Sequence, residues 1–350
     1  MQTSAPRTEP HLEHLPEEFE HPPQEVEAAV TPSARGRVMR IVSIVVSVIF
    51  LAAAVWWISK QKMPTIPSGT HAYLSIAGAL ALYALATLFR GERWHQLLRH
   101  TDIHPKRVDS YCVTTVGYAG NNILPARAGE ALRVVLISGR AEASKREALG
   151  TIIAERVLDA AVLAIAFAFG AYGTLVSGSP IALLGIVALG ILVVALFPSR
   201  FHPNPSHPRL KWIVESLARL LAPTRNLISR EGLLLFGMTL VIWTIEATVY
   251  FLVAHAVDLG ISFGGAVFIM VVANFVALIP AGPGYVGTFD AAILFAAHKL
   301  GRVHSSAISF LLLLRFVLFI PITVTGLLLL VGRYGGLAGY RAARLQAAEA

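Results

Sequence analysis

Residues 121–130 read Asn-Asn-Ile-Leu-Pro-Ala-Arg-Ala-Gly-Glu and interrupt an otherwise apolar segment that extends from Tyr111 to Ser138. Residues 279–287 read Ile-Pro-Ala-Gly-Pro-Gly-Tyr-Val-Gly and interrupt a second apolar segment, Gly265 to Leu300, in the same way. Both stretches end helices, because proline lacks an amide hydrogen and glycine loses more backbone freedom than other residues on folding. Each segment is therefore predicted to form two short helices joined by a break.

Long uncharged runs surround these interrupted segments, among them Ile41–Ile58, Ala72–Phe89 and Ile181–Phe197. A helix of roughly 20 apolar residues spans the hydrocarbon core of a bilayer. Only 14% of the 350 residues are charged, against roughly 25% in soluble proteins, and the mean hydropathy is +0.64. The sequence thus predicts an all-α, polytopic membrane bundle with about six full transmembrane helices and two re-entrant helix pairs.

The distribution of basic residues supports this topology. If both interrupted segments return to the side that they left, the predicted cytoplasmic segments hold 20 Lys and Arg residues and the outside loops hold 4. Since cytoplasmic loops carry an excess of positive charge, both termini are predicted to lie in the cytoplasm. The breaks align as Leu124–Gly129 with Ile279–Gly284, which indicates an inverted repeat whose broken helices meet near the midplane.

Three regions are expected along the chain. Residues 1–37 are rich in proline and glutamate and are predicted to be a disordered cytoplasmic tail. Residues 38–333 form the membrane domain, and residues 334–350 a short cytoplasmic tail. The segment Arg209–Leu221 mixes basic and apolar residues, which suits either an interfacial helix or an ordinary loop helix. The single cysteine, Cys112, excludes an internal disulfide, and no nucleic-acid-binding, metal or cofactor motif is found.

Charged groups inside apolar segments cost roughly 2.5–3.5 kcal/mol each on insertion scales, so they face the bundle interior or water. Some neutralise one another, as Arg156 and Asp159 would within one helix. Glu246 and Arg315 have no local partner and are expected to pair across helices or to meet a ligand. A half-helix starting near Thr288 would expose amide groups to an anion such as a lipid phosphate, although a hinge without a ligand is the alternative. The candidate substrate-binding residues are Asn121, Asn122, Arg127, Glu130, Glu155, Arg156, Asp159, Glu246, Gly284, Gly287, Asp290 and Arg315.

Three motifs in order resemble the transmembrane-domain family of lysylphosphatidylglycerol synthases: residues 121–130, the Glu-Arg-Val-Leu-Asp run at 155–159, and residues 279–287. The resemblance covers roughly Val38 to Arg333. In the best-understood members this domain translocates an aminoacylated phospholipid that a separate soluble domain makes. The resemblance therefore implies lipid translocation. We expect no soluble aminoacyltransferase domain within these 350 residues.

With this resemblance, the sequence is interpreted as a multi-pass lipid flippase or scramblase of a bacterial inner membrane, for a phospholipid or glycolipid, and not as an enzyme. Arg127, Arg156 and Arg315 would hold the lipid phosphate, while the carboxylates would neutralise them or hold a cationic headgroup. A membrane enzyme or accessory subunit acting on polyprenyl or glycolipid intermediates is one alternative, and a small-solute secondary transporter is another. The expected partners are membrane lipids, together with a second copy of the chain or a lipid-modifying enzyme, and not nucleic acid.

Overall fold

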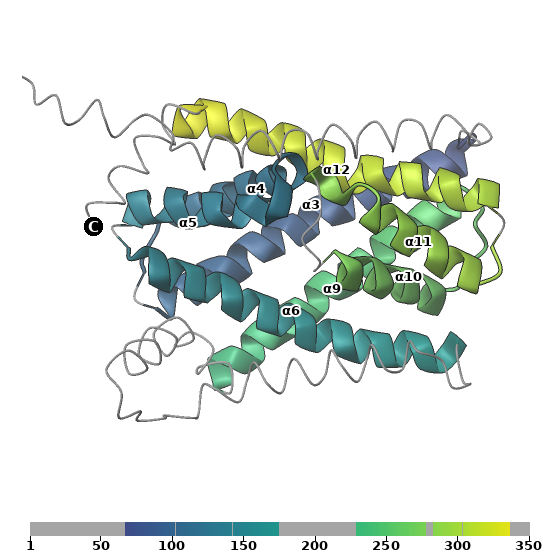
Figure 1. The fold of residues 1–350 in the computed structure, drawn as a ribbon, viewed down its shortest axis with the longest axis horizontal. Helices are drawn as coiled ribbons and strands as arrows, with labels where there is room; N and C mark the ends of the chain where they lie inside the picture. The colour runs from purple at the N-terminus through teal and green to yellow at the C-terminus, as the bar shows by residue number, and fades with distance from the viewer. Residues whose placement is uncertain are drawn as a thin grey trace, which may run out of the picture. The chain divides into compact units, whose positions relative to one another are not determined.

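The computed structural model describes residues 67–101, 103–141, 143–174, 229–277, 283–302 and 304–336, all within one compact unit, Ser47–Ala350. Every regular element in these ranges is a helix (Figure 1). The elements are α3 (Thr70–Arg99), α4 (Arg107–Ile123), η1 (Pro125–Arg127), α5 (Ala128–Ala141), α6 (Lys145–Thr174), α9 (Arg230–Ala256), α10 (Phe263–Val276), η3 (Pro283–Tyr285), α11 (Thr288–Lys299) and α12 (His304–Tyr334). The predicted runs at 41–58 and 181–197, the basic segment at 209–221 and the N-terminal tail lie outside the described residues.

Three of the described helices are long and apolar enough to cross a membrane. They are Thr70–Arg99, Arg230–Ala256 and Ser305–Tyr334, with mean hydropathies of 1.8, 1.8 and 2.4 over their most apolar windows. A fourth long helix, α6, carries three charged residues in its middle, at positions 155, 156 and 159. The all-helical membrane architecture is thus as expected, while the number of crossings stays a prediction.

The first interrupted segment forms a helical pair in which α5 packs back along α4. Pro125 begins the short 3-10 turn η1 that separates the two helices. Their close approach depends on glycine: a Cβ added to Gly129 would lie 2.0 Å from the carbonyl oxygen of Gly117, and one added to Gly120 would lie 2.8 Å from the Cα of Gly129. Both ends of the pair lie together, since Arg140 near the end of α5 lies 3.7 Å from Asp109 at the start of α4.

The second interrupted segment is built in the same way from α10, η3 and α11. The predicted start of the half-helix at Thr288 is where α11 begins. Gly265 in the first turn of α10 packs against the side chain of Leu300, which directly follows α11. This pair therefore also begins and ends at one end of the bundle.

The two pairs point toward each other from opposite ends. The long helix α12 starts beside the second pair, where the guanidinium of Arg302 lies against Gly260. It ends beside the first pair, where Arg333 binds Asp109 at 2.9 Å. The turns η1 and η3 contact each other between these ends. This inverted arrangement of the two pairs supports the re-entrant assignment, which stays a prediction.

Two arginines of the charge count lie within a helix. Arg90 and Arg93 belong to the 20 basic residues of the predicted cytoplasmic segments, and α3 continues to Arg99 and buries both side chains, which are 6% and 1% exposed. The run of uncharged residues ends at Phe89, but the helix continues through both arginines. It can do so because acidic residues of α6 and α9 neutralise them.

Candidate functional site

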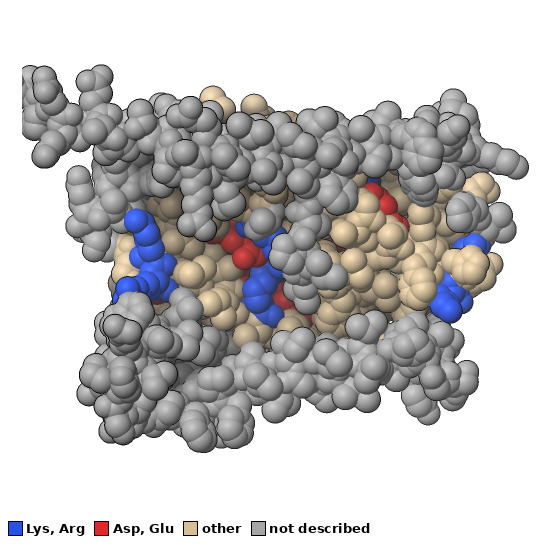
Figure 2. All heavy atoms as spheres, in the orientation of Figure 1, with Lys and Arg blue, Asp and Glu red and all other residues tan. Residues whose placement is uncertain are grey.

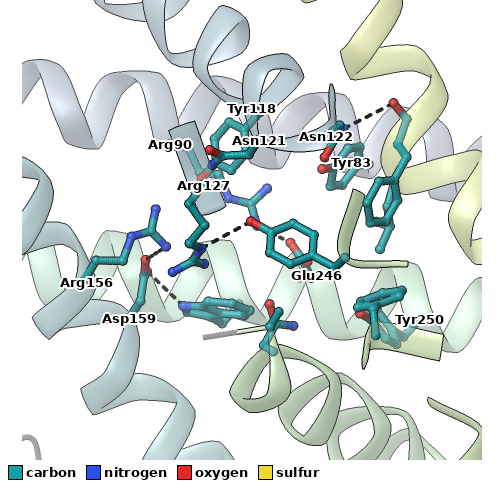
Figure 3. Close-up of a pocket in the computed structure, with 17 residues that line it drawn as sticks. Tyr83, Arg90, Tyr118, Asn121, Asn122, Arg127, Arg156, Asp159, Glu246 and Tyr250 are labelled. Carbon is teal, nitrogen blue, oxygen red and sulfur yellow. Dashed lines mark hydrogen bonds and ion pairs between the residues drawn. The ribbon is translucent and has the colours of Figure 1, made fainter. Parts of the chain in front are cut away.

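A polar cavity of about 110 Å³ lies where the two helix breaks meet (Figure 3). This is room for several water molecules or a phosphate-sized group. Its lining includes four tyrosines, three arginines, three asparagines and two carboxylates. The lining residues are Tyr83, Arg90, Tyr118, Asn121, Asn122, Arg127, Arg156, Asp159, Trp243, Glu246, Tyr250, Asn274, Ala277, Tyr285, Phe289, Leu318 and Phe319.

Arg127 reaches into this cavity from the first helix break (Figure 3). Its Nε donates a hydrogen bond to the hydroxyl oxygen of Tyr285 in the second break, at 3.2 Å. Both residues have a positive φ, 57° for Arg127 and 54° for Tyr285, which costs about 1–2 kcal/mol for a residue other than glycine. The nearest carboxylate in the described residues, Glu130, is 4.0 Å away. Arg127 is therefore held in a strained conformation with its terminal amino groups only loosely paired.

Arg156 lies on α6 at the edge of the same cavity. It is 3.3 Å from both Glu130 and Asp159, so it connects the first helix break with α6. Its Nε is buried but lacks a well-aligned hydrogen bond within the described residues. The expected pairing of Arg156 with Asp159 is present, but each carboxylate that it contacts also lies near another arginine.

Behind the cavity lies a fully buried ionic network. Arg93 binds Asp159 at 2.7 Å and Thr239 at 2.9 Å, and it lies 3.4 Å from Glu155. Glu155 also accepts a hydrogen bond from Arg133 at 2.7 Å. Glu155 is 1% exposed and is not among the residues that line the cavity. It therefore pairs with two arginines inside the bundle and does not contact the cavity.

Aromatic side chains complete this network. The guanidinium of Arg133 lies over the Trp94 ring, 4.1 Å from its centroid. Trp243 donates from Nε1 to Asp159 at 3.2 Å. These contacts stabilise the buried charges, which would be costly if left unpaired in a low-dielectric interior.

Glu246 finds its partner across the bundle in Arg90 of α3, and both side chains are 8% exposed. This confirms that Glu246 pairs across helices. Arg90 also lies over two tyrosine rings of the cavity, 5.8 Å from the centroid of Tyr83 and 5.5 Å from that of Tyr118. Arg90 was absent from the predicted site. Its position directly after the apolar run 72–89 could have indicated a buried charge.

The two predicted asparagines both line the cavity. Asn122 donates to Thr323 of α12 at 2.9 Å, which fixes the end of α4 against that helix. Asn121 is 8% exposed, and its side-chain oxygen has no hydrogen-bond partner in the described part of the chain. A third asparagine, Asn274, enters from α10. Such amides can accept and donate hydrogen bonds to a polar ligand.

Arg315, Asp290, Gly284 and Gly287 form a separate cluster at the start of α11, outside the cavity lining. Arg315 donates from Nε to Asp290 at 2.6 Å and from Nη1 to the carbonyl oxygen of Gly284 at 3.1 Å. The Asp290 carboxylate also accepts from the amide of Gly287 at 2.9 Å. The anion at this helix start is thus the chain's own Asp290. A substrate-binding role for these four residues stays a prediction.

The cavity and the network behind it carry an excess positive charge. Within the described residues, five arginines (Arg90, Arg93, Arg127, Arg133 and Arg156) face four carboxylates (Glu130, Glu155, Asp159 and Glu246). Figure 2 shows acidic and basic side chains next to each other near the middle of one face, separated by uncharged residues from basic groups at its ends. An unbalanced positive charge inside the bundle favours an anionic ligand.

The structure therefore brings six predicted residues together around the cavity, namely Asn121, Asn122, Arg127, Arg156, Asp159 and Glu246, with Glu130 directly beside them. Sequence reasoning missed Arg90, Asn274 and the aromatic residues. Tyrosines occur in several of the described helices, and only the packing distinguishes those that meet at the cavity.

Comparison with protein families matches residues 30–326 to the family described as "Lysylphosphatidylglycerol synthase TM region". Among curated proteins, the chain is similar to "Glycosyltransferase AglD" of Haloferax volcanii, with 24% identity over 326 residues. That match covers 79% of this chain and 51% of the relative, so the chain spans about half the length of the curated relative that it matches.

These matches identify a membrane protein of lipid or glycolipid metabolism or transport. They also correct one prediction. The chain was expected not to be an enzyme, and that expectation is overturned by its similarity to a protein named as a glycosyltransferase. The expectation rested on the lack of a soluble aminoacyltransferase domain and of a metal or cofactor motif, and these do not cover every class of membrane enzyme.

Proposed function

This chain belongs to the family of lysylphosphatidylglycerol synthase transmembrane regions, and on that basis we propose that it binds the phosphate of a membrane lipid in the cavity between its helix breaks and moves that lipid between leaflets. The observation that carries the proposal is the loosely paired guanidinium of Arg127 in a cavity whose surroundings hold one more arginine than carboxylate. Arginine binds phosphate oxygens strongly, because its planar group donates two parallel hydrogen bonds.

The arrangement of the helix pairs supports movement as well as binding. Each pair starts and ends at its own end of the bundle, and the two turns meet at the cavity. In transporters built from inverted repeats, the substrate site lies between such broken helices and opens to one side at a time. In this chain, the Arg127–Tyr285 hydrogen bond would join the two pairs when the site is closed.

A second candidate is an enzymatic or accessory role on a lipid-linked sugar, and the similarity to a glycosyltransferase favours it. The same cavity would then hold the phosphate of the lipid-linked substrate. Chemical turnover of such a lipid by the purified protein would support this candidate. Movement of an unchanged lipid between leaflets would support translocation.

Co-purifying lipids test the binding step. The full chain, the Arg127→Gln variant and an Arg107→Gln control would be purified in detergent and their bound lipids measured by native mass spectrometry. Arg107 is a suitable control because its side chain is 62% exposed and pairs only with Glu92 at 3.3 Å among the described residues; such surface pairs contribute about 0–1 kcal/mol.

We expect the wild-type protein and the control to retain a phosphate-containing lipid, and Arg127→Gln to lose it while remaining folded. Equal lipid retention in all three proteins would refute the phosphate site. Inorganic phosphate at the same concentration should not displace the lipid, and displacement would reassign the cavity to a free anion. Transfer of a labelled lipid between leaflets of reconstituted vesicles then tests translocation with the same three proteins.

A further inference from the structure

The carboxylates around the cavity are all engaged by arginine, which limits the headgroups that the cavity can take. Glu246 pairs with Arg90, and Asp159 binds Arg93 as well as Arg156. Glu130 lies within 4.0 Å of Arg127 and 3.3 Å of Arg156. An ammonium group that approached any of these carboxylates would lie beside an arginine of the same charge. Taking Glu246 would also leave the buried Arg90 without its carboxylate.

Arginines of the chain already lie over most of the aromatic rings that line the cavity. Tyr83 and Tyr118 face the guanidinium of Arg90 at 5.8 and 5.5 Å, and Tyr285 faces that of Arg127 at 5.9 Å. Phe289 and Phe319 face that of Arg315 at 5.6 and 5.1 Å. The two remaining rings, Trp243 and Tyr250, are buried, 8% and 0% exposed. Recognition of an ammonium headgroup by an aromatic cage requires several free ring faces within about 6 Å of the cation.

The cavity does offer groups for uncharged hydroxyls. Asn121 and Asn274 are both among the lining residues. Their uncharged amides can donate hydrogen bonds to hydroxyls or accept hydrogen bonds from them. A phosphate at Arg127 with hydroxyl-bearing carbons next to it would match both the excess charge and these amides.

We infer that the cavity selects lipids whose headgroup is a phosphodiester bearing hydroxyls and no ammonium group, and that it disfavours aminoacylated and other cationic headgroups. This inference rests on the proposed lipid-phosphate function and names its substrate class. It separates the chain from the substrate that the family's name denotes, because the carboxylates that would receive a lysyl group are occupied.

Phosphatidylglycerol and lysyl-phosphatidylglycerol make a matched pair of probes, since they differ only in one lysyl ester. Binding of each lipid to the purified full chain would be measured by native mass spectrometry over a range of concentrations. We expect phosphatidylglycerol to bind at least about tenfold more tightly, because like charges are strongly disfavoured in a buried site. Equal or tighter binding of the lysyl lipid would overturn the inference while leaving the phosphate site intact. Binding of neither lipid would also overturn the inference, whereas the proposed function fails only if the purified protein retains no phosphate-containing lipid.

Two variants separate charge selection from general lipid affinity. Asn121→Asp adds a carboxylate at the cavity with almost no change in volume, and Arg127→Gln removes the loosely paired cation. Both should reduce the preference for phosphatidylglycerol by about tenfold or more if they remove the excess charge, whereas Arg107→Gln should leave it unchanged. Retention of the wild-type preference in either cavity variant, with unfolding temperatures near that of the wild type, would overturn the inference.

Discussion

Arg127 and Tyr285, which are 158 residues apart, join the two helix breaks through a hydrogen bond of 3.2 Å from the Arg127 Nε to the tyrosine hydroxyl oxygen. The contact holds the guanidinium at the cavity, and both residues adopt the left-handed backbone region to make it. Strained residues of this kind cluster at ligand sites and switch regions. The pair is therefore the most direct point at which to perturb the site without disturbing the core.

Tyr285→Phe removes only the hydroxyl acceptor of this pair. We expect a loss of about 0.5–1.5 kcal/mol in stability, the net value of one hydrogen bond, and weaker binding of a phosphate-containing lipid because Arg127 is no longer oriented. Lipid binding and thermal unfolding of the purified protein measure the two effects. Tyr73→Phe is the control, since Tyr73 is 62% exposed. Unchanged lipid binding in Tyr285→Phe would show that the Arg127–Tyr285 hydrogen bond plays no part in binding the lipid.

Asp159 and Arg156 should differ sharply in their effect on stability. Asp159→Leu leaves the buried Arg93 without its 2.7 Å partner, a change that typically costs about 3–5 kcal/mol. Arg156→Leu should cost less, because its side chain is 26% exposed. The double variant should unfold as easily as Asp159→Leu alone. Recovery of near wild-type stability in the double variant would mean that Asp159 mainly serves Arg156.

The α4–α5 interface should not tolerate a methyl group at Gly129. Its Cβ would lie 2.0 Å from the carbonyl oxygen of Gly117 and 2.5 Å from the amide nitrogen of Asn121. Since overpacking costs about 1–3 kcal/mol even where side chains can move, we expect Gly129→Ala to lose at least that much stability. Gly332→Ala in α12 is the control, with no atom within 4 Å of the added Cβ. Comparable unfolding temperatures for the two variants would contradict the close packing.

Gly284 should tolerate asparagine better than valine. Its φ of 61° lies in the left-handed region, and a Cβ would lie 3.3 Å from the carbonyl oxygen of Asn122. Asparagine adopts this backbone conformation more readily than a β-branched residue does. Thermal unfolding should therefore rank wild type above Gly284→Asn and Gly284→Asn above Gly284→Val. An equal effect of the two substitutions would point to crowding, and not to backbone conformation, as the constraint.

Topology reporters test the re-entrant pairs. Because Arg302 lies against Gly260, reporters fused after Gly260 and after Gly301 should lie on the same side of the membrane. That side is expected to be the outside, as for a reporter after Ser177, while reporters after Arg225 and Arg344 should lie inside. Cysteine accessibility or enzyme fusions measure the sidedness. An inside signal at Gly260 would contradict the inverted arrangement of the two pairs.

The sequence by itself determined the features that depend on neighbouring residues. Apolar runs long enough to span a bilayer become α3, α9 and α12, because backbone groups in hydrocarbon must be satisfied within the segment. The break at Pro125 and the helix start at Thr288 follow from local backbone chemistry. Membership of the candidate site was also visible for Arg127 and Glu246, since a charge in an apolar segment requires a partner or a ligand.

Only the tertiary structure decided which of these charged side chains are closely paired and which is only loosely paired. Arg90 pairs with Glu246 across 156 residues, and Arg93 takes the carboxylate that the sequence pairs with Arg156. At the helix start where a lipid phosphate is predicted to bind, the Asp290 carboxylate accepts a hydrogen bond from the Gly287 amide. Ion pairs between distant residues depend on how helices pack, and packing is not encoded in any single local pattern. The loosely paired state of Arg127 is therefore a property of the assembled bundle, because it is set by which carboxylates the other four arginines engage.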